Sequence, residues 1–74
     1  FMNSINFNIA DRPVNLILHD DGHDGPAFRV IAMKNRSSAI SFARFKHFED
    51  ALAYRNKYSS YYPFVKFYVY RSLF

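Results

Sequence analysis

The spacing of apolar residues changes twice along this chain, and these changes constrain the fold more than any other feature of the sequence. Within residues 13–45 apolar side chains recur at alternate positions, which is the period of a β-strand. Across residues 48–60 they recur every three to four positions, the period of an α-helix. Alternation returns in residues 64–71, after Pro63. The sequence therefore predicts strands on both sides of a single helix.

Turn-forming residues divide the first alternating region into three strands, predicted at residues 13–19, 27–34 and 39–45. Because the connections between them are short, we expect these strands to form an antiparallel meander. A helix followed by one more strand predicts a crossover that lays the last strand parallel to a sheet partner. The predicted fold class is α+β, in the order β-β-β-α-β, with a small, mainly antiparallel sheet and one helix packed on one face.

The length of the chain allows one domain. With 74 residues, half of them apolar, it lies near the lower limit for an unaided core. Residues 1–12 alternate only weakly, so we predict an N-terminal arm at 1–12 and a single α+β domain at 13–74. This arm carries Ile5, Phe7 and Ile9, and can either form an edge strand or dock on the sheet.

The alternation also sorts the strand side chains onto two faces. One set is predicted to form the core against the helix: Val14, Leu16, Leu18, Phe28, Val30, Ala32, Ile40, Phe42, Val65, Phe67 and Val69. The other set faces outward: Ile17, Arg29, Ile31, Met33, Ala43, Phe45, Lys66, Tyr68 and Tyr70. So many apolar groups on an outward face indicate either a contact surface or a face covered by the arm.

Charge and aromatic residues are unevenly distributed along the chain. Residues 1–24 carry one arginine and four aspartates, a net charge of −3, whereas residues 25–74 carry nine basic and two acidic residues, a net charge of +7. Twelve of the fifteen aromatic residues follow position 41, and they alternate there with Lys and Arg. This pattern predicts recognition of another macromolecule, including an anionic one.

The only cluster of potential metal ligands in the sequence lies at residues 19–24. As a calcium loop it fails, because Gly22 and Ile31 stand where ligands are required. His19 and His23 with an aspartate could supply three zinc ligands, but a turn rich in Asp and Gly accounts for the same residues. We therefore predict neither a metal nor a cofactor.

Catalytic motifs are not evident either. The chain contains no cysteine, no serine in a nucleophile elbow and only two glycines, so nucleophilic catalysis and phosphate-binding loops have no support and we predict that it is not an enzyme. The lack of cysteine suits a reducing interior, and no apolar run reaches the length of a membrane span. The predicted location is the cytoplasm of a bacterial host, with no membrane partner.

A small basic chain that combines the segment PVNLILHDDGHDGPAFRV with an aromatic C-terminal strand resembles the regulators that phages make against host transcription, such as the antitermination proteins of Xanthomonas phages. The resemblance implies binding to bacterial RNA polymerase at the β′ subunit near the RNA exit channel. It also implies inhibition of host initiation and, together with NusA, read-through of terminators. Nascent RNA is a further expected partner. The alternative function is a single-stranded RNA- or DNA-binding domain that uses its sheet face.

Both functions draw on the same predicted partner-binding residues. An acidic loop is expected to meet basic polymerase surface, and four cations to meet acidic polymerase surface or RNA. Two exposed rings beside the cations are expected to pack on the partner or stack on bases. The full set is Asp20, Asp21 and Asp24 in the loop, the cations Arg29, Arg44, Lys66 and Arg71, and the rings Tyr68 and Tyr70.

Overall fold

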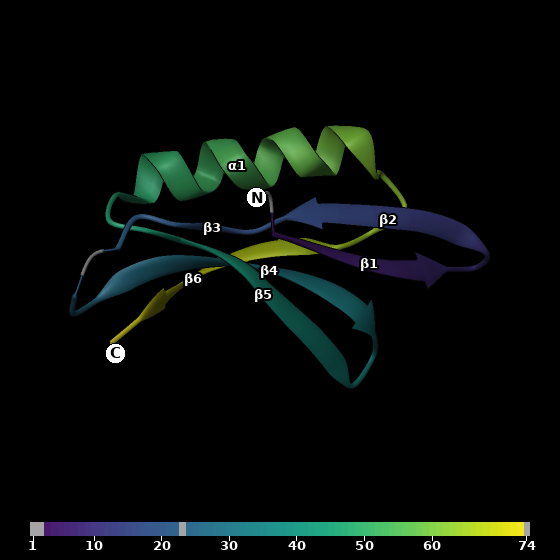
Figure 1. Cartoon of the computed structure of the whole chain (residues 1–74), viewed down its shortest axis with the longest axis horizontal. Coiled ribbons are helices and arrows are strands. Elements are labelled where there is room, and N and C mark those ends of the chain that lie inside the picture. The colour runs from purple at the N-terminus through teal and green to yellow at the C-terminus, as the bar shows by residue number, and fades with distance from the viewer. Residues whose placement is uncertain (1–2, 23, 74) are drawn as a thin grey trace.

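The structure, a computed structural model, describes residues 3–22 and 24–73. Its elements are β1 (Ser4–Ile9), β2 (Arg12–Ile17), β3 (His19–Asp20), β4 (Ala27–Asn35), β5 (Ser38–Phe45), α1 (Phe48–Tyr61) and β6 (Phe67–Ser72). The predicted α+β class, with one helix packed on a sheet, is confirmed (Figure 1). Within the described part of the chain, no helix has the length and apolar character needed to cross a membrane.

The main sheet has four strands in the order β3-β5-β4-β6. Both β5 and β6 are antiparallel to the central strand β4, and α1 carries the chain from β5 across β4 to β6. β6 is thus parallel to the strand from which the crossover starts, but its sheet partner is the antiparallel β4. The prediction of a parallel partner is wrong because the crossover skips one strand.

The remaining two strands, β1 and β2, form a separate antiparallel hairpin. The predicted meander is therefore wrong for its first strand, and the predicted arm at 1–12 contains β1. Ala10 and Asp11 form the two-residue turn, and both have positive φ, 50° and 65°, as type I′ hairpin turns require. Alanine is an uncommon residue at such a position, so the usual sequence signal of a tight hairpin is missing.

The hairpin and α1 lie on the same side of the main sheet and enclose the core with it (Figure 1). Val30, Phe42 and Phe67 are buried there, as predicted. Ile5, Phe7 and Ile9 from β1 also pack against this core. The N-terminal residues therefore cover the inner face of the sheet, and the opposite face is open.

A β-bulge at Phe42 changes which residues of β5 point to the core. The partner of Val30 is Ala43, but the next residue, Ile31, pairs with Ser41, so Phe42 is the extra residue. The alternation reverses at this point, and Phe42, Ala43 and Phe45 are all buried. The prediction that Ala43 and Phe45 face outward is therefore wrong, because strict alternation does not allow for a bulge.

Leu18, which was predicted to be in the core, is exposed. It lies between β2 and β3, where the chain leaves the hairpin and joins the main sheet. Leu16 is the last buried side chain of β2, because the alternation of buried and exposed residues in β2 does not continue into β3.

Three tyrosines close the free edge of β2. The Tyr58 hydroxyl accepts a hydrogen bond from Ile17 N at 3.2 Å, and the Tyr54 hydroxyl donates to Ile17 O at 2.5 Å. The Tyr62 hydroxyl both accepts from Asn15 N and donates to Asn15 O, each at 3.2 Å. Tyr54 and Tyr58 thus satisfy both backbone groups of Ile17, and Tyr62, the residue that follows α1, satisfies both backbone groups of Asn15, two positions earlier in β2. α1 is thus fixed to the hairpin edge.

Candidate functional site

The open side of the main sheet, which we call the outer face, carries most of the residues predicted to bind a partner. Its side chains follow from the strand register, since residues paired across strands share a face. They are Arg29, Ile31 and Met33 from β4, Ser41 and Arg44 from β5, Tyr68 and Tyr70 from β6, and Lys66, whose carbonyl oxygen bonds to Met33 N just before β6. Three cations and two rings thus converge on one surface.

Tyr68 and Tyr70 are the exposed rings of this face. Their exposed fractions are 48% and 44%, so each ring has one side available for contact. They stand at alternate positions of β6, about 6.8 Å apart along the strand. Tyr68 pairs with Ile31 and Tyr70 with Arg29 on the neighbouring strand. The outer face therefore offers two rings in a line, one of them beside a cation.

Arg29 and Arg44 are directly opposite each other on β4 and β5. Because Met33 N bonds to Lys66 O, the odd-numbered residues of β4 point their backbone groups toward β6. Arg29 and Arg44 are consequently a non-hydrogen-bonded pair, the type whose side chains are closer. Like charges in such positions destabilise a sheet. A carboxylate or another anion beside either side chain therefore lowers the cost of this pairing.

The two arginines differ in how firmly they are held. The Arg44 side chain is only 14% exposed, donates to Gly25 O at 2.7 Å and lies 3.6 Å from the Asp20 carboxylate. Arg29 has no hydrogen bond or ion pair with any other residue in the ranges 3–22 and 24–73. Arg44 is thus a fixed cation, and Arg29 is a half-buried cation whose charge is not matched.

A hollow of about 470 Å³ opens beside this arginine pair, between β5 and the start of the hairpin. It is lined by both guanidinium-bearing residues, by Ser41 and by Asn3 and Leu18 from the hairpin side. Its donors are an amide, a hydroxyl and two guanidinium groups, which suit a phosphate oxygen, and the Asp20 carboxylate lines it as well.

A second hollow of about 320 Å³ lies at the opposite end of the main sheet, where Ile9 of the hairpin also lines it. Lys34 and Arg36 line it together with Lys66, and Tyr68 and Phe64 supply aromatic walls. Cations therefore stand at both ends of the tyrosine pair. Lys34 and Arg36 were not among the predicted site residues: Lys34 ends the strand predicted at 27–34, and Arg36 lies in the turn that follows it. The sequence feature that could have identified them is two basic residues close together at the end of the strand that carries Arg29.

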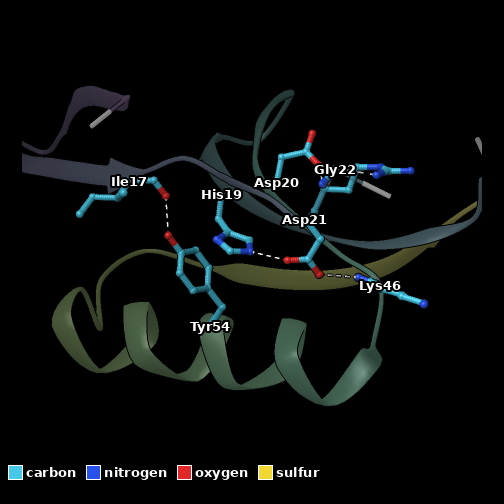
Figure 2. Close-up of polar contacts among 8 residues, drawn as sticks. Ile17, His19, Asp20, Asp21, Gly22, Lys46 and Tyr54 are labelled. Carbon is cyan, nitrogen blue, oxygen red and sulfur yellow. Dashed lines mark hydrogen bonds and ion pairs between the residues drawn. The ribbon is translucent and has the colours of Figure 1, made fainter. Parts of the chain in front are cut away.

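The acidic loop is tied to the sheet by its own carboxylates (Figure 2). Asp20 accepts a hydrogen bond from Gly22 N at 2.8 Å. Asp21 accepts from Lys46 N at 2.9 Å and lies 2.7 Å from His19 Nε2. The bond from Lys46 N and then the contact with His19 lower the pKa of the Asp21 carboxyl below its usual value. Asp20 and Asp21 therefore stabilise the loop through contacts within the protein, in addition to any role in binding a partner.

His19 itself is held by aromatic contacts on the inner side of the sheet. Its ring stacks on Phe45 with centroids 4.4 Å apart, and Tyr54 lies 5.9 Å away. His23, the other predicted zinc ligand, lies outside the described residues. Among the residues that the structure describes, no group of three His, Asp or Glu side chains could hold a metal ion. The expectation of no metal stays a prediction.

The remaining predicted residues lie apart from the outer face. Asp24 is exposed in the loop before β4. Arg71 pairs with Phe28, so it points to the helix side of the sheet, where Phe28 contacts the exposed Phe48 with ring centroids 5.5 Å apart. Sequence position alone placed Arg71 with Tyr70, but alternation puts adjacent residues on opposite faces.

Comparisons of the chain with protein-family models, with curated proteins and with solved structures found no match.

Proposed function

We propose that this protein binds single-stranded nucleic acid on its outer face. The observation that carries the proposal is the row of side chains Arg44, Arg29 and Tyr70 on adjacent strands, with Tyr68 next along β6. Exposed rings on a sheet are the surfaces on which unpaired bases stack, and nearby cations neutralise the phosphates. A base lies on each tyrosine, and the strand follows β6.

The basic residues of the outer face favour an anionic partner, such as a nucleic acid, over an uncharged one. Arg44 is paired with Asp20, whereas Arg29 makes no ion pair with a described residue, so a phosphate beside Arg29 matches a charge that the fold leaves unpaired. The second basic hollow, with Lys34, Arg36 and Lys66, receives the backbone at the other end of the tyrosine pair. The strand therefore spans the outer face from one hollow to the other, with the bases over the rings.

The test is fluorescence anisotropy with a labelled ten-nucleotide oligouridine, repeated across a range of salt concentrations. Tyr70→Ala is expected to weaken binding by about 1–3 kcal/mol, the usual contribution of one stacked base. Arg29→Ala is expected to lower the slope of log affinity against log salt by about 0.7, the value for one phosphate contact on a single strand.

Tyr61→Ala is the matched control for the tyrosine variant. Tyr61 is 61% exposed but lies on α1, on the other side of the sheet from the outer face. Its removal should leave affinity unchanged. Salt-independent binding, or an equal loss in the Tyr61 and Tyr70 variants, would refute the proposal.

Binding to bacterial RNA polymerase in the cytoplasm of a phage host, at β′ near the RNA exit channel with NusA, is a second proposal. The observation that favours it is the patch of Phe28, exposed Phe48 and Arg71, which a nucleic acid on the outer face does not cover. Such a patch suits a protein partner. Transcription through a terminator with purified polymerase tests it, comparing wild type with Phe48→Ala. Unchanged read-through and promoter output at saturating wild-type protein would exclude this function.

A further inference from the structure

β6 is an edge strand with one unpaired side. It ends the main sheet, and its only strand partner among the described residues is β4. The bond from Met33 N to Lys66 O fixes which backbone groups are used. Residues 66, 68, 70 and 72 direct their N–H and C=O groups to β4, so Phe67, Val69 and Arg71 direct theirs away from the sheet.

The two strand edges of the hairpin are less suited to pairing. Tyrosine hydroxyls close the free edge of β2. The free edge of β1 presents Ser4, Asn6 and Asn8, and asparagine is a poor strand former. β6 contains only Phe, Tyr, Val, Arg and Ser, without proline or bulge. Charged residues, prolines and bulges usually protect an edge strand from pairing, and β6 has only one of these, the charge of Arg71.

We propose that β6 pairs antiparallel with β6 of a second copy of this chain, about a two-fold axis at Val69. In this register Val69 faces Val69 of the second copy, and Phe67 faces Arg71 of the second copy. All three outward-directed residues of each strand then find a partner, which gives six backbone hydrogen bonds.

The charges of the strand agree with this register. Arg71 lies opposite an aromatic residue, and Lys66 lies opposite Ser72 of the second copy, so no like charges face each other. A two-fold axis at Tyr68 would instead place Arg71 opposite Val65, whose N–H already bonds to Tyr62 O. An axis at Tyr70 would leave Phe67 opposite Leu73, beyond the end of the strand.

Pairing also changes the outer face. A two-fold axis between antiparallel edge strands is perpendicular to the sheet, so the outer faces of both copies lie on the same side. Tyr68 of one copy then stands opposite Tyr70 of the second copy. The dimer presents four adjacent tyrosines, with an arginine pair on each side of them. This consequence for nucleic-acid binding rests on the proposed function, but the pairing itself does not.

The first experiment measures the mass of the protein by light scattering after size exclusion, from 1 to about 200 µM, without nucleic acid. We expect a concentration-dependent rise from 8.8 kDa toward twice that mass. Val69→Pro should shift the dissociation constant upward by more than about tenfold. Its N–H points away from β4, so proline removes only the intermolecular bond. Val69→Ala keeps the N–H and should remain dimeric. A wild-type monomer throughout, or equal dimerisation of the proline variant, overturns the pairing.

The second experiment tests the register and does not depend on the fold of the proline variant. The chain has no cysteine, so introduced thiols are the only ones. Tyr68→Cys and Tyr70→Cys proteins are mixed and oxidised at low concentration of oxidant. The two positions form a non-hydrogen-bonded pair with Cα atoms about 4.5 Å apart, within the range for a disulfide of about 4.4–6.8 Å. A heterodimeric crosslink is expected in the mixture. Equal crosslinking of Tyr68→Cys with itself would overturn the register.

Discussion

The tyrosine contacts on β2 predict a specific cost for removing one hydroxyl. Tyr58→Phe keeps the ring, which packs against Phe42 with centroids 5.4 Å apart, and removes the acceptor of the 3.2 Å bond from Ile17 N. Tyr58 is 3% exposed, so water does not readily replace that acceptor. An unsatisfied buried donor costs about 1–3 kcal/mol, and the length of the bond favours the lower half of that range.

The assay for this variant is thermal and denaturant unfolding, with amide hydrogen exchange as the local measurement. A domain of this size loses about 4–8 °C in Tm for each kcal/mol. Tyr61→Phe is the matched control, because the Tyr61 hydroxyl makes no hydrogen bond with any described residue. It should stay within about 0.5 kcal/mol of wild type. If Tyr58→Phe is equally neutral and the exchange rate of the Ile17 amide is unchanged, the hydroxyl does not hold the hairpin edge.

Two further predictions concern pH and the core. Burial, with a smaller contribution from the Tyr58 hydroxyl, raises the pKa of Tyr54 above its ordinary value. The folded state therefore favours the neutral phenol, and this contribution is complete below about pH 10 and lost as pH rises above it. The free energy of unfolding should fall less steeply between pH 10 and 12 for Tyr54→Phe than for wild type, and parallel curves would contradict the assignment. Phe67→Ala should cost about 3–5 kcal/mol in urea unfolding, because Phe67 is buried, whereas Tyr70→Ala on the same strand should cost less than about 1 kcal/mol. Similar costs for the two would show that the faces of β6 are assigned the wrong way round.

Local pattern determined most of the secondary structure of this protein. The helix predicted at 48–60 is found at Phe48–Tyr61, and the strands predicted at 27–34 and 39–45 are found at Ala27–Asn35 and Ser38–Phe45. These elements could be predicted because the period of apolar residues reports directly on a strand or helix with one buried side. The outward direction of Tyr68 and Tyr70 followed from the same alternation.

The arrangement of these elements was decided by contacts between residues distant in sequence. The bulge at Phe42 depends on how β5 meets β4, and the hairpin depends on a turn at Ala10 and Asp11 that carries no strong local signal. The Tyr54 and Tyr58 hydroxyls reach the edge of β2 only because the helix is laid beside it.

The candidate site divides in the same way between sequence and tertiary structure. Basic and aromatic residue types were visible in the chain, as was the alternation of Lys66, Tyr68 and Tyr70. The opposition of Arg29 and Arg44 required the register of two strands, which the bulge shifts by one residue. Local sequence sets the direction of a side chain relative to its own strand, whereas a binding surface depends on which strands become neighbours. Only tertiary packing determines that choice, because it depends on burying both the hairpin and the helix against one face of the sheet.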